Sequence, residues 1–247
     1  MEPAPGRAYF RFYAELNDHL PRARRFRTLE RTFFVPAPVK DLIESCGVPH
    51  TEVELIVANS ESVGFSYVVQ NGDRIAVYPM FESFDVTPEL KVRPAPLREP
   101  KFVLDVHLGR LAAYLRMLGF DAVYRNQASD AELVRISAGE QRILLTRDRG
   151  LLQHGGVTHG YWLRNADSRR QLVEVVGRFD LTRSLRPFSR CMVCNEVLEE
   201  VLRVRADDDY RECPQCGKVY WQGSHYRRME RWIREVAAGA DPPEHNS

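Results

Sequence analysis

The chain has 247 residues, 44% of them hydrophobic and 28% charged, with a formal net charge of +1. These values are typical of a soluble globular protein with room for two domains and a small third, and they exclude a strongly basic surface over the whole molecule. Because residues 1–10 lack an apolar core of signal-peptide length and no run approaches a membrane span, we expect a cytoplasmic protein without a membrane partner.

Residues 1–86 predict a small domain of strands around one helix. Partial alternation of apolar and polar residues predicts strands at 9–14, 31–35, 53–58 and 74–78. Pro38 and Gly47 delimit a helix over 39–46. The resulting order, strand-strand-helix-strand-strand, is the layout of a ubiquitin-like β-grasp.

Residues 87–100 hold four of the 15 prolines, which predicts an extended, stiff linker. We expect the chain after it to divide into an α/β region at 101–186, a cysteine-containing region at 187–238 and a disordered tail at 239–247.

The stretch 101–152 alternates apolar strands with helices. Strands are expected at 102–104, 120–124 and 143–145, and a helix over 108–118 that Gly119 ends. Ser129 with Glu132 three residues later predicts a capping box at the start of the next helix. This alternation predicts a parallel sheet with helices on its faces.

Three acidic residues follow or adjoin the carboxyl ends of these strands. Asp105 and Asp148 come just after strands, and Asp130 opens a helix. Active groups gather at this edge of an open α/β sheet, and clustered carboxylates are costly unless a cation lies among them. The hypothesis is a metal-dependent phosphodiesterase with Mg²⁺ or Mn²⁺. Alternatively, each Asp serves only local turn and cap geometry.

Basic and histidine side chains around this edge have two interpretations. Arg110, Arg147 and Arg149 either contact nucleic-acid phosphates or balance nearby carboxylates, and Arg116 is a weaker candidate. His154 and His159 are metal ligands or proton carriers, or belong to a surface loop. Further on, a strand is expected at 161–163 and a helix capped by Ser168, with its apolar stripe in the core.

Two CxxC pairs dominate the C-terminal region: Cys191 with Cys194, and Cys213 with Cys216. This spacing predicts a four-cysteine zinc ribbon, with a closed structural Zn²⁺ site. Residues 199–210 are expected to form its hairpin, with residues 207–209 at the tip.

Ser224 is expected to cap a final helix. Its basic and aromatic residues either contact single-stranded or structured RNA or pack against the ribbon. The RNA-contact candidates on this helix are Tyr226, Arg227 and Arg228.

Three stretches carry a resemblance to known families. DAELVRISAGEQRILLTRDRGLL resembles the carboxyl half of a PIN-domain ribonuclease, and FVLDVHLGRLAAYLRMLGFD resembles the compact PIN variant called the Mut7-C ribonuclease domain. VELIVANSESVGFSYVVQNGDRIAVYPMF is similar to sulfur-carrier β-grasp domains and to the ubiquitin-like domain of some Mut7-C proteins. Because no Gly-Gly tail ends this domain, a docking role that binds a protein partner is expected in place of conjugation.

The resemblance implies a function and its residues. It implies a ribonuclease in which Asp105, Asp130 and Asp148 bind Mg²⁺ or Mn²⁺ and Thr146 orients one of them. The helix that carries a further acidic residue in many PIN domains does not fit here, which leaves the number of metals open; Glu132 or Asp167 would be the substitute. The enzyme would be an RNA-processing nuclease or a growth-arresting toxin. The rival hypothesis is a non-catalytic adaptor that binds RNA or protein through the ribbon and the β-grasp domain.

Overall fold

The computed structural model describes residues 5–79, 100–201, 210–221 and 224–237. Within the last segment, nothing is described for the side chains of residues 224–226, 228 and 237. Three predicted segments therefore lie outside the described residues: the linker (except residue 100), the hairpin tip and the C-terminal tail. The chain forms two compact units, Met1–Arg98 with Leu152–Gly155, and Glu99–Leu151 with Gly156–Ser247, and each is considered by itself.

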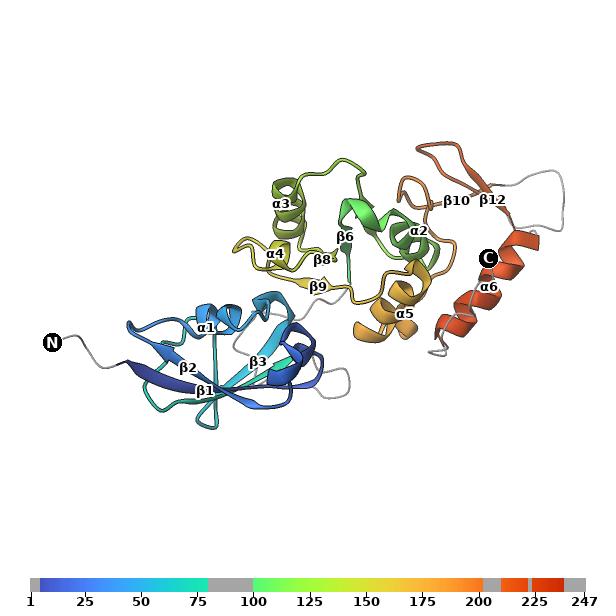
Figure 1. Ribbon diagram of the computed structural model, residues 1–247. Coiled ribbons are helices and arrows are strands. Elements are labelled where there is room, and N and C mark those ends of the chain that lie inside the picture. Colours follow the sequence, from blue (N-terminus) through green and yellow to red (C-terminus); the bar gives the residue numbers. More distant parts are fainter. Residues whose placement is uncertain (1–4, 80–99, 202–209, 222–223, 238–247) are drawn as a thin grey trace. The chain divides into compact units, whose positions relative to one another are not determined.

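The first unit is a five-stranded sheet with one α-helix (Figure 1). Its elements are β1 (Gly6–Phe12), β2 (Thr28–Phe33), α1 (Val39–Ser45), β3 (Val53–Ala58), β4 (Glu61–Val63) and β5 (Arg74–Pro79), with short 3-10 turns at Ala14–His19, Arg22–Arg24 and His50–Glu52. The strand order is β2-β1-β5-β3-β4, with β1 parallel to β5 and the other pairs antiparallel. This is the expected β-grasp, with one added strand, β4, too short to show a period in the sequence.

Alternation along β1 separates the two faces of this sheet. Phe10 and Phe12 are buried with the α1 residues Val39 and Ile43 in one hydrophobic core. The intervening side chains of β1 point away from that core. The first unit therefore has one face covered by α1 and one uncovered by its own described elements.

The second unit is built on a four-stranded sheet in the order β7-β6-β8-β9, with every pair parallel. Its strands are β6 (Phe102–Leu104), β7 (Ala122–Tyr124), β8 (Ile143–Thr146) and β9 (Gly160–Trp162). The connecting elements are α2 (Gly109–Met117), α3 (Asp130–Glu140), α4 (Arg149–Leu152) and α5 (Ser168–Arg178), with 3-10 turns at Val106–Leu108 and Leu181–Ser184. The predicted parallel α/β sheet is confirmed.

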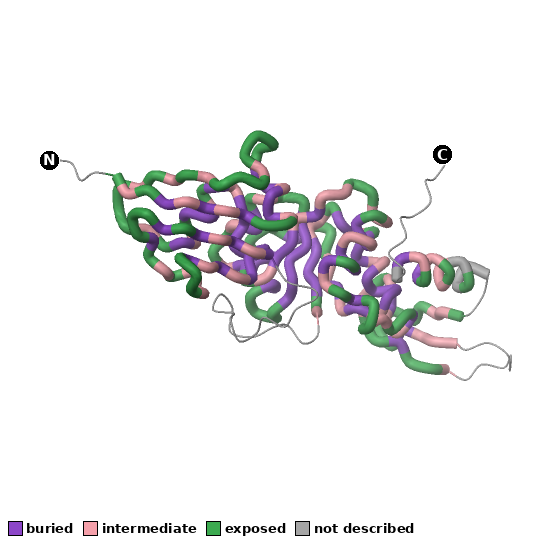
Figure 2. Tube along the Cα trace, turned by 90° about the horizontal axis from the view of Figure 1, so that it is seen from below, coloured by how far each residue is buried: buried purple, intermediate pink, exposed green. Residues whose placement is uncertain are grey.

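Helices cover both faces of this sheet, α3 on one side and α2 with α5 on the other (Figure 1). Every residue of β6 and β8 is buried, as expected for central strands of a parallel sheet covered on both faces. Figure 2 shows such buried residues in purple inside each unit. The central strands thus fix the ends from which the acidic residues emerge.

Two helix starts illustrate how local chemistry sets these boundaries. The Ser129 hydroxyl accepts from the Glu132 backbone N–H at 3.3 Å, so the predicted cap of α3 is present. For α5, the predicted cap Ser168 is wrong by one residue. The Asp167 carboxylate accepts from the N–H groups of Arg169 and Arg170, both at 3.0 Å, and satisfies two orphan donors where a hydroxyl would accept one.

The C-terminal part of the second unit adds a three-stranded antiparallel sheet in the order β10-β11-β12, followed by α6. The bounds are β10 (Glu199–Val201), β11 (Tyr210–Glu212), β12 (Val219–Trp221) and α6 (Ser224–Ala237). Helix α6 packs on α5, and the Trp232 ring meets the Tyr114 ring of α2 edge-on at 4.7 Å between centroids.

Buried polar contacts join the ribbon to the nuclease-like core. Arg116 on α2 is buried and donates to the carbonyl oxygens of Ala122, Met192 and Val193 at 2.9, 3.2 and 2.7 Å. Arg116 is therefore a structural residue, and its candidacy as a phosphate contact is wrong because the residue is 5% exposed and its Nε and Nη1 groups donate to backbone carbonyls.

Candidate active site and metal centre

Asp105 and Thr146 meet at the carboxyl edge of the parallel sheet. Strands β6 and β8 are paired in register at Leu104 and Leu145, so the next residue of each strand emerges side by side. The Thr146 hydroxyl donates to Asp105 Oδ2 at 2.7 Å. Thr146 is fully buried, and Asp105 is partly exposed. Asp105 Oδ2 is thus held by Thr146, while Asp105 Oδ1 accepts from the His107 backbone N–H at 3.4 Å at the start of the Val106–Leu108 turn.

Asp148 is joined to the same hydroxyl through its backbone. The Asp148 N–H donates to Thr146 Oγ1 at 2.9 Å, and the Asp148 Oδ1 accepts from the Gly150 N–H at 2.8 Å. The Asp148 side chain itself is exposed. Thr146 therefore links the two strand-end acids by accepting from one residue and donating to the other.

Asp130 lies at the same edge but is not part of this hydrogen-bonded group. It is the exposed first residue of α3, and it follows β7, whose carboxyl end shares the edge with β6 because the two strands are parallel. In the described portion of the chain, Asp105, Asp130 and Asp148 do not form a cluster with all ligand atoms within 4.8 Å of one another. The Asp105 carboxylate and the Asp148 backbone thus share the Thr146 hydroxyl, and Asp130 begins the helix that follows the neighbouring strand β7.

The two substitutes considered for a further acidic ligand are engaged elsewhere. Glu132 forms an ion pair with Arg125, and Asp167 accepts the two N–H groups at the start of α5. Neither carboxylate belongs to the Asp105–Thr146–Asp148 group.

Trp162 is a neighbour of this edge that the sequence reading treated only as part of a strand. It pairs with Thr146 in the β8–β9 register, and its indole Nε1 donates to the Arg147 carbonyl at 3.2 Å. The Arg149 guanidinium lies 3.8 Å from the Trp162 ring centroid, a cation–π distance. In the sequence Trp162 lies inside the expected strand at 161–163, and no signal there indicated its contact with Arg149.

The other side chains predicted to contact RNA or a metal are spread over several elements. Arg110 and Arg147 are exposed near the edge, at the start of α2 and just after β8. His159 Nδ1 lies 3.0 Å from the Thr158 hydroxyl, and His154 is exposed. Arg227 on α6 is exposed as well. The side chains of Tyr226 and Arg228 lie outside the described residues.

The four cysteines converge as their spacing predicts. Their sulfur atoms all lie within 4.8 Å of one another, with Cys191 and Cys216 at 3.6 Å and Cys194 and Cys213 at 3.4 Å. Two pairs of sulfurs on facing tight turns are the donor set of a tetrahedral metal ion. The group has the geometry to hold a metal and fits a zinc ribbon.

Tyr220 supports this cluster from β12. Its hydroxyl lies 3.2 Å from Cys191 Sγ and accepts from the Met192 N–H at 3.0 Å. Burial opposes ionisation of Cys191, but the Tyr220 hydroxyl and backbone N–H groups donate to its sulfur and lower the pKa of Cys191 to about 6. Burial and the neighbouring thiols raise the pKa of Cys194 to about 12. Four thiolates at this separation need a compensating cation.

Both parts of the chain are similar to known protein families. A family model described as Mut7-C RNAse domain matches residues 100–233, more than half of the chain, and one described as Mut7-C ubiquitin matches residues 6–85. The chain belongs to the Mut7-C RNAse family. The two matches confirm the predicted resemblance of residues 100–233 to the Mut7-C ribonuclease domain and of residues 6–85 to the ubiquitin-like domain of this Mut7-C protein. No curated protein and no solved structure matches it.

Within the described residues of this Mut7-C protein, no helix is both long and apolar enough to cross a membrane.

Proposed function

We propose that this chain is a metal-dependent ribonuclease that cleaves RNA at the carboxyl edge of the β7-β6-β8-β9 sheet. The observation that carries the proposal is the Thr146 hydroxyl, which donates to Asp105 and accepts from the backbone of Asp148. A buried hydroxyl that orients one of two strand-end carboxylates is a ligand-positioning arrangement. Membership of a ribonuclease family names RNA as the substrate class.

The donor atoms at this edge suit a hard cation. Asp105 and Asp148 offer carboxylate oxygens, the ligands that Mg²⁺ and Mn²⁺ prefer. Mg²⁺ is commonly held by only one or two carboxylates, with waters and substrate phosphates completing its shell. Asp105 and Asp148 would hold the ion, with Asp130 contributing from the start of α3. The ion would supply an activated water and neutralise charge on the phosphate.

The side chains of this edge have separate tasks. Thr146 holds Asp105 in one orientation, and the backbone turn at Asp148 is fixed by the same hydroxyl. Arg149, stacked on Trp162, would present its guanidinium to a phosphate, together with Arg110 and Arg147. Such contacts give affinity without sequence preference.

We also propose that the four-cysteine cluster binds Zn²⁺ as a structural ion. All four ligands come from the protein, which leaves no position for a reacting water. The ion would stabilise the ribbon and, through Arg116, its attachment to α2.

The decisive experiment compares cleavage of labelled RNA with added Mn²⁺ and with EDTA. Asp148→Asn removes one carboxylate charge at the edge, and Asp180→Asn is the matched control. Asp180 is an exposed carboxylate of the same unit with φ 45°, a left-handed conformation that Asn tolerates well. We expect Mn²⁺-dependent cleavage by the wild type and by Asp180→Asn, and a loss of at least about 100-fold in Asp148→Asn.

Equal cleavage by Asp148→Asn, or cleavage indifferent to EDTA, would contradict the metal-dependent mechanism. RNA binding with no cleavage by the wild type under any divalent cation would favour a non-catalytic adaptor.

A further inference from the structure

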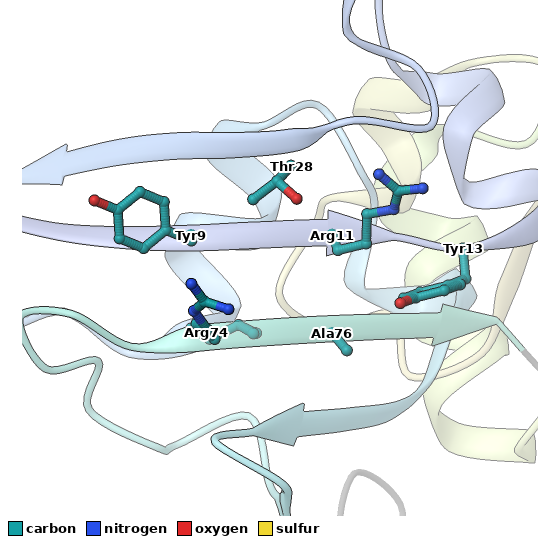
Figure 3. Close-up of a pocket in the computed structure, with 7 residues that line it drawn as sticks. Tyr9, Arg11, Tyr13, Thr28, Arg74 and Ala76 are labelled. Carbon is teal, nitrogen blue, oxygen red and sulfur yellow. The ribbon is translucent and has the colours of Figure 1, made fainter.

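The first unit carries a hollow on the sheet face that α1 does not cover. It has a volume of about 500 Å³ and is lined by Tyr9, Arg11, Tyr13, Thr28, Arg74, Ile75 and Ala76. Figure 3 shows Tyr9 with Arg74 toward one end of the neighbouring strands β1 and β5, and Arg11 with Tyr13 toward the other. The hollow lies within one compact unit and shares no lining residue with the acidic edge of the second.

Small residues beside large ones create this hollow. On β5, Ala76 pairs with Arg11 of β1, and on the other side of β1 the partner of Arg11 is Thr28 of β2. Because each strand presents alternate residues to one face, these short side chains lie between longer ones. Ala76 and Thr28 therefore form the bottom of the hollow, and arginine and tyrosine side chains form its sides.

The positive charge of the hollow is not balanced by the described acidic residues. Arg7, one step along the same face of β1, forms an ion pair with Glu30 at 3.6 Å. Arg11 and Arg74 form no such pair within the described ranges. Arg11 instead lies 6.0 Å from the Tyr13 ring centroid. Two guanidinium groups without a carboxylate partner favour an anionic ligand.

The aromatic rings add a second requirement. Tyr13 stacks on Tyr78 of β5, with centroids 4.3 Å apart and planes 13° from parallel, and Tyr13 remains 38% exposed. Tyr9 is partly exposed at the other end of the hollow. An acidic peptide would use the positive charge of the arginines but would have no need of the exposed tyrosine rings. A nucleic-acid strand uses both, because its bases stack on aromatic side chains while its phosphates contact arginines.

We propose that this face of the ubiquitin-like unit binds a single-stranded RNA segment, with phosphates at Arg11 and Arg74 and a base against Tyr13. The identity of the polymer as RNA rests on the proposed ribonuclease function; the site itself rests on the hollow, its charge and its rings. The face would bind the substrate through residues other than those of the acidic edge. It would add affinity without base specificity.

The test measures binding of a fluorescein-labelled oligo-uridine by anisotropy across a series of salt concentrations. The full chain is used with Asp148→Asn, so that cleavage does not interfere. The paired substitution Arg11→Gln with Arg74→Gln removes both contacts, and Arg7→Gln removes an equally basic residue already paired with Glu30. Each single-strand phosphate contact contributes about 0.7 to the salt slope, so we expect the slope to fall by roughly 1.4 in the double variant and to stay constant in Arg7→Gln.

Tyr13→Leu separates stacking from charge. We expect oligo-uridine affinity to fall by about 5-fold or more with an unchanged salt slope, because a base loses its aromatic partner while the phosphate contacts remain. Circular dichroism of each variant establishes that the fold is retained.

The proposal is overturned if the folded double variant binds oligo-uridine with the wild-type slope, or if its loss only equals that of Arg7→Gln. It is also overturned if these substitutions abolish binding of a polyglutamate peptide but not of oligo-uridine, which would assign the face to an acidic protein. Mn²⁺-dependent RNA cleavage is measured in a separate assay with protein that retains Asp148. A negative result for RNA binding at this face can therefore be distinguished from a negative result for the nuclease proposal.

Discussion

At the scale of single residues, Thr146 connects the two acidic residues Asp105 and Asp148 through one side-chain hydroxyl. Its hydroxyl is buried at the end of β8 and forms one hydrogen bond as donor and one as acceptor. Thr146→Val keeps the shape and removes both bonds. We expect RNA cleavage to fall by about 10- to 100-fold, the usual effect of removing a group that orients a metal ligand.

Thr146→Ser is the matched control because it restores the hydroxyl. We expect it to recover most of the cleavage rate, measured at saturating Mn²⁺ with labelled RNA. If Thr146→Ser, which keeps the hydroxyl, loses as much activity as Thr146→Val, the orientation argument is wrong.

Gly119 is a second residue whose requirement is local. It adopts φ +95° after α2, and a Cβ there would lie 2.2 Å from the Arg186 carbonyl oxygen. Both the left-handed backbone and the contact exclude a side chain. We expect Gly119→Ala to lower the free energy of unfolding by about 2–4 kcal/mol, measured by urea denaturation. Gly139→Ala is the control, since nothing lies within 4 Å of its Cβ position and a helical Ala is favourable. Equal stability of the two variants would contradict the packing described for Gly119.

At the scale of elements, the join between β7, β8 and the ribbon depends on one carboxylate. Asp121 accepts from Arg142 at 2.7 and 3.1 Å and from the Asn195 amide at 2.7 Å. The Asn195 side chain also accepts from the Ala122 N–H at 3.0 Å. Burial opposes ionisation of Asp121, but these donors and the charge of Arg142 hold its pKa below the usual 3.8.

This pKa direction predicts a dependence of stability on pH. Because the folded pKa of Asp121 is depressed, its contribution is complete above the unfolded pKa and is lost as the pH falls through the folded pKa. We expect Asp121→Asn to cost about 1–3 kcal/mol at neutral pH, with the difference from wild type shrinking below about pH 4. Thermal unfolding of both proteins across pH measures this; a difference independent of pH would contradict the assignment.

The sequence predicted those elements whose signal is local. Strands β6 and β8 are uninterrupted apolar runs, and α3 has a hydroxyl cap that can be read directly. The cap of α5 was misplaced by one residue because Asp167 and Ser168 are both good cap residues, and only geometry decides between them. Strand β4 has three residues, too few for a period to show.

Contacts between distant residues were beyond sequence reasoning. The spacing of the cysteines and the position of Thr146 before Asp148 could be read from the chain, and the structure brings both groups together. The stacking of Arg149 on Trp162 and the hollow on the β-grasp face could not. Both depend on strand pairing between residues well separated along the chain.

At the scale of the whole molecule, we expect the proposed zinc ion to stabilise the second unit and leave the first unchanged. Cys213→Ser removes one buried ligand, and the metal content, measured by elemental analysis, is expected to fall from about one Zn²⁺ per chain to near zero. Hydrogen exchange should then accelerate in the ribbon and at β7, which it contacts through Asn195.

The strands β1–β5 form a separate compact unit and provide the internal control for this exchange experiment. Cys46→Ser is the matched variant, because Cys46 lies in the first unit outside the four-cysteine cluster. Retention of a full equivalent of zinc by Cys213→Ser would contradict a site that needs all four thiolates.

The account depends most on whether the carboxyl edge of the parallel sheet binds a hard cation. Crystals of the protein soaked in Mn²⁺ and measured for anomalous scattering test this directly. We predict an anomalous peak within coordination distance of the Asp105 and Asp148 carboxylates, lost in crystals of Asp105→Asn. Manganese bound only elsewhere, or a fully folded edge without any peak, would contradict the proposed active site.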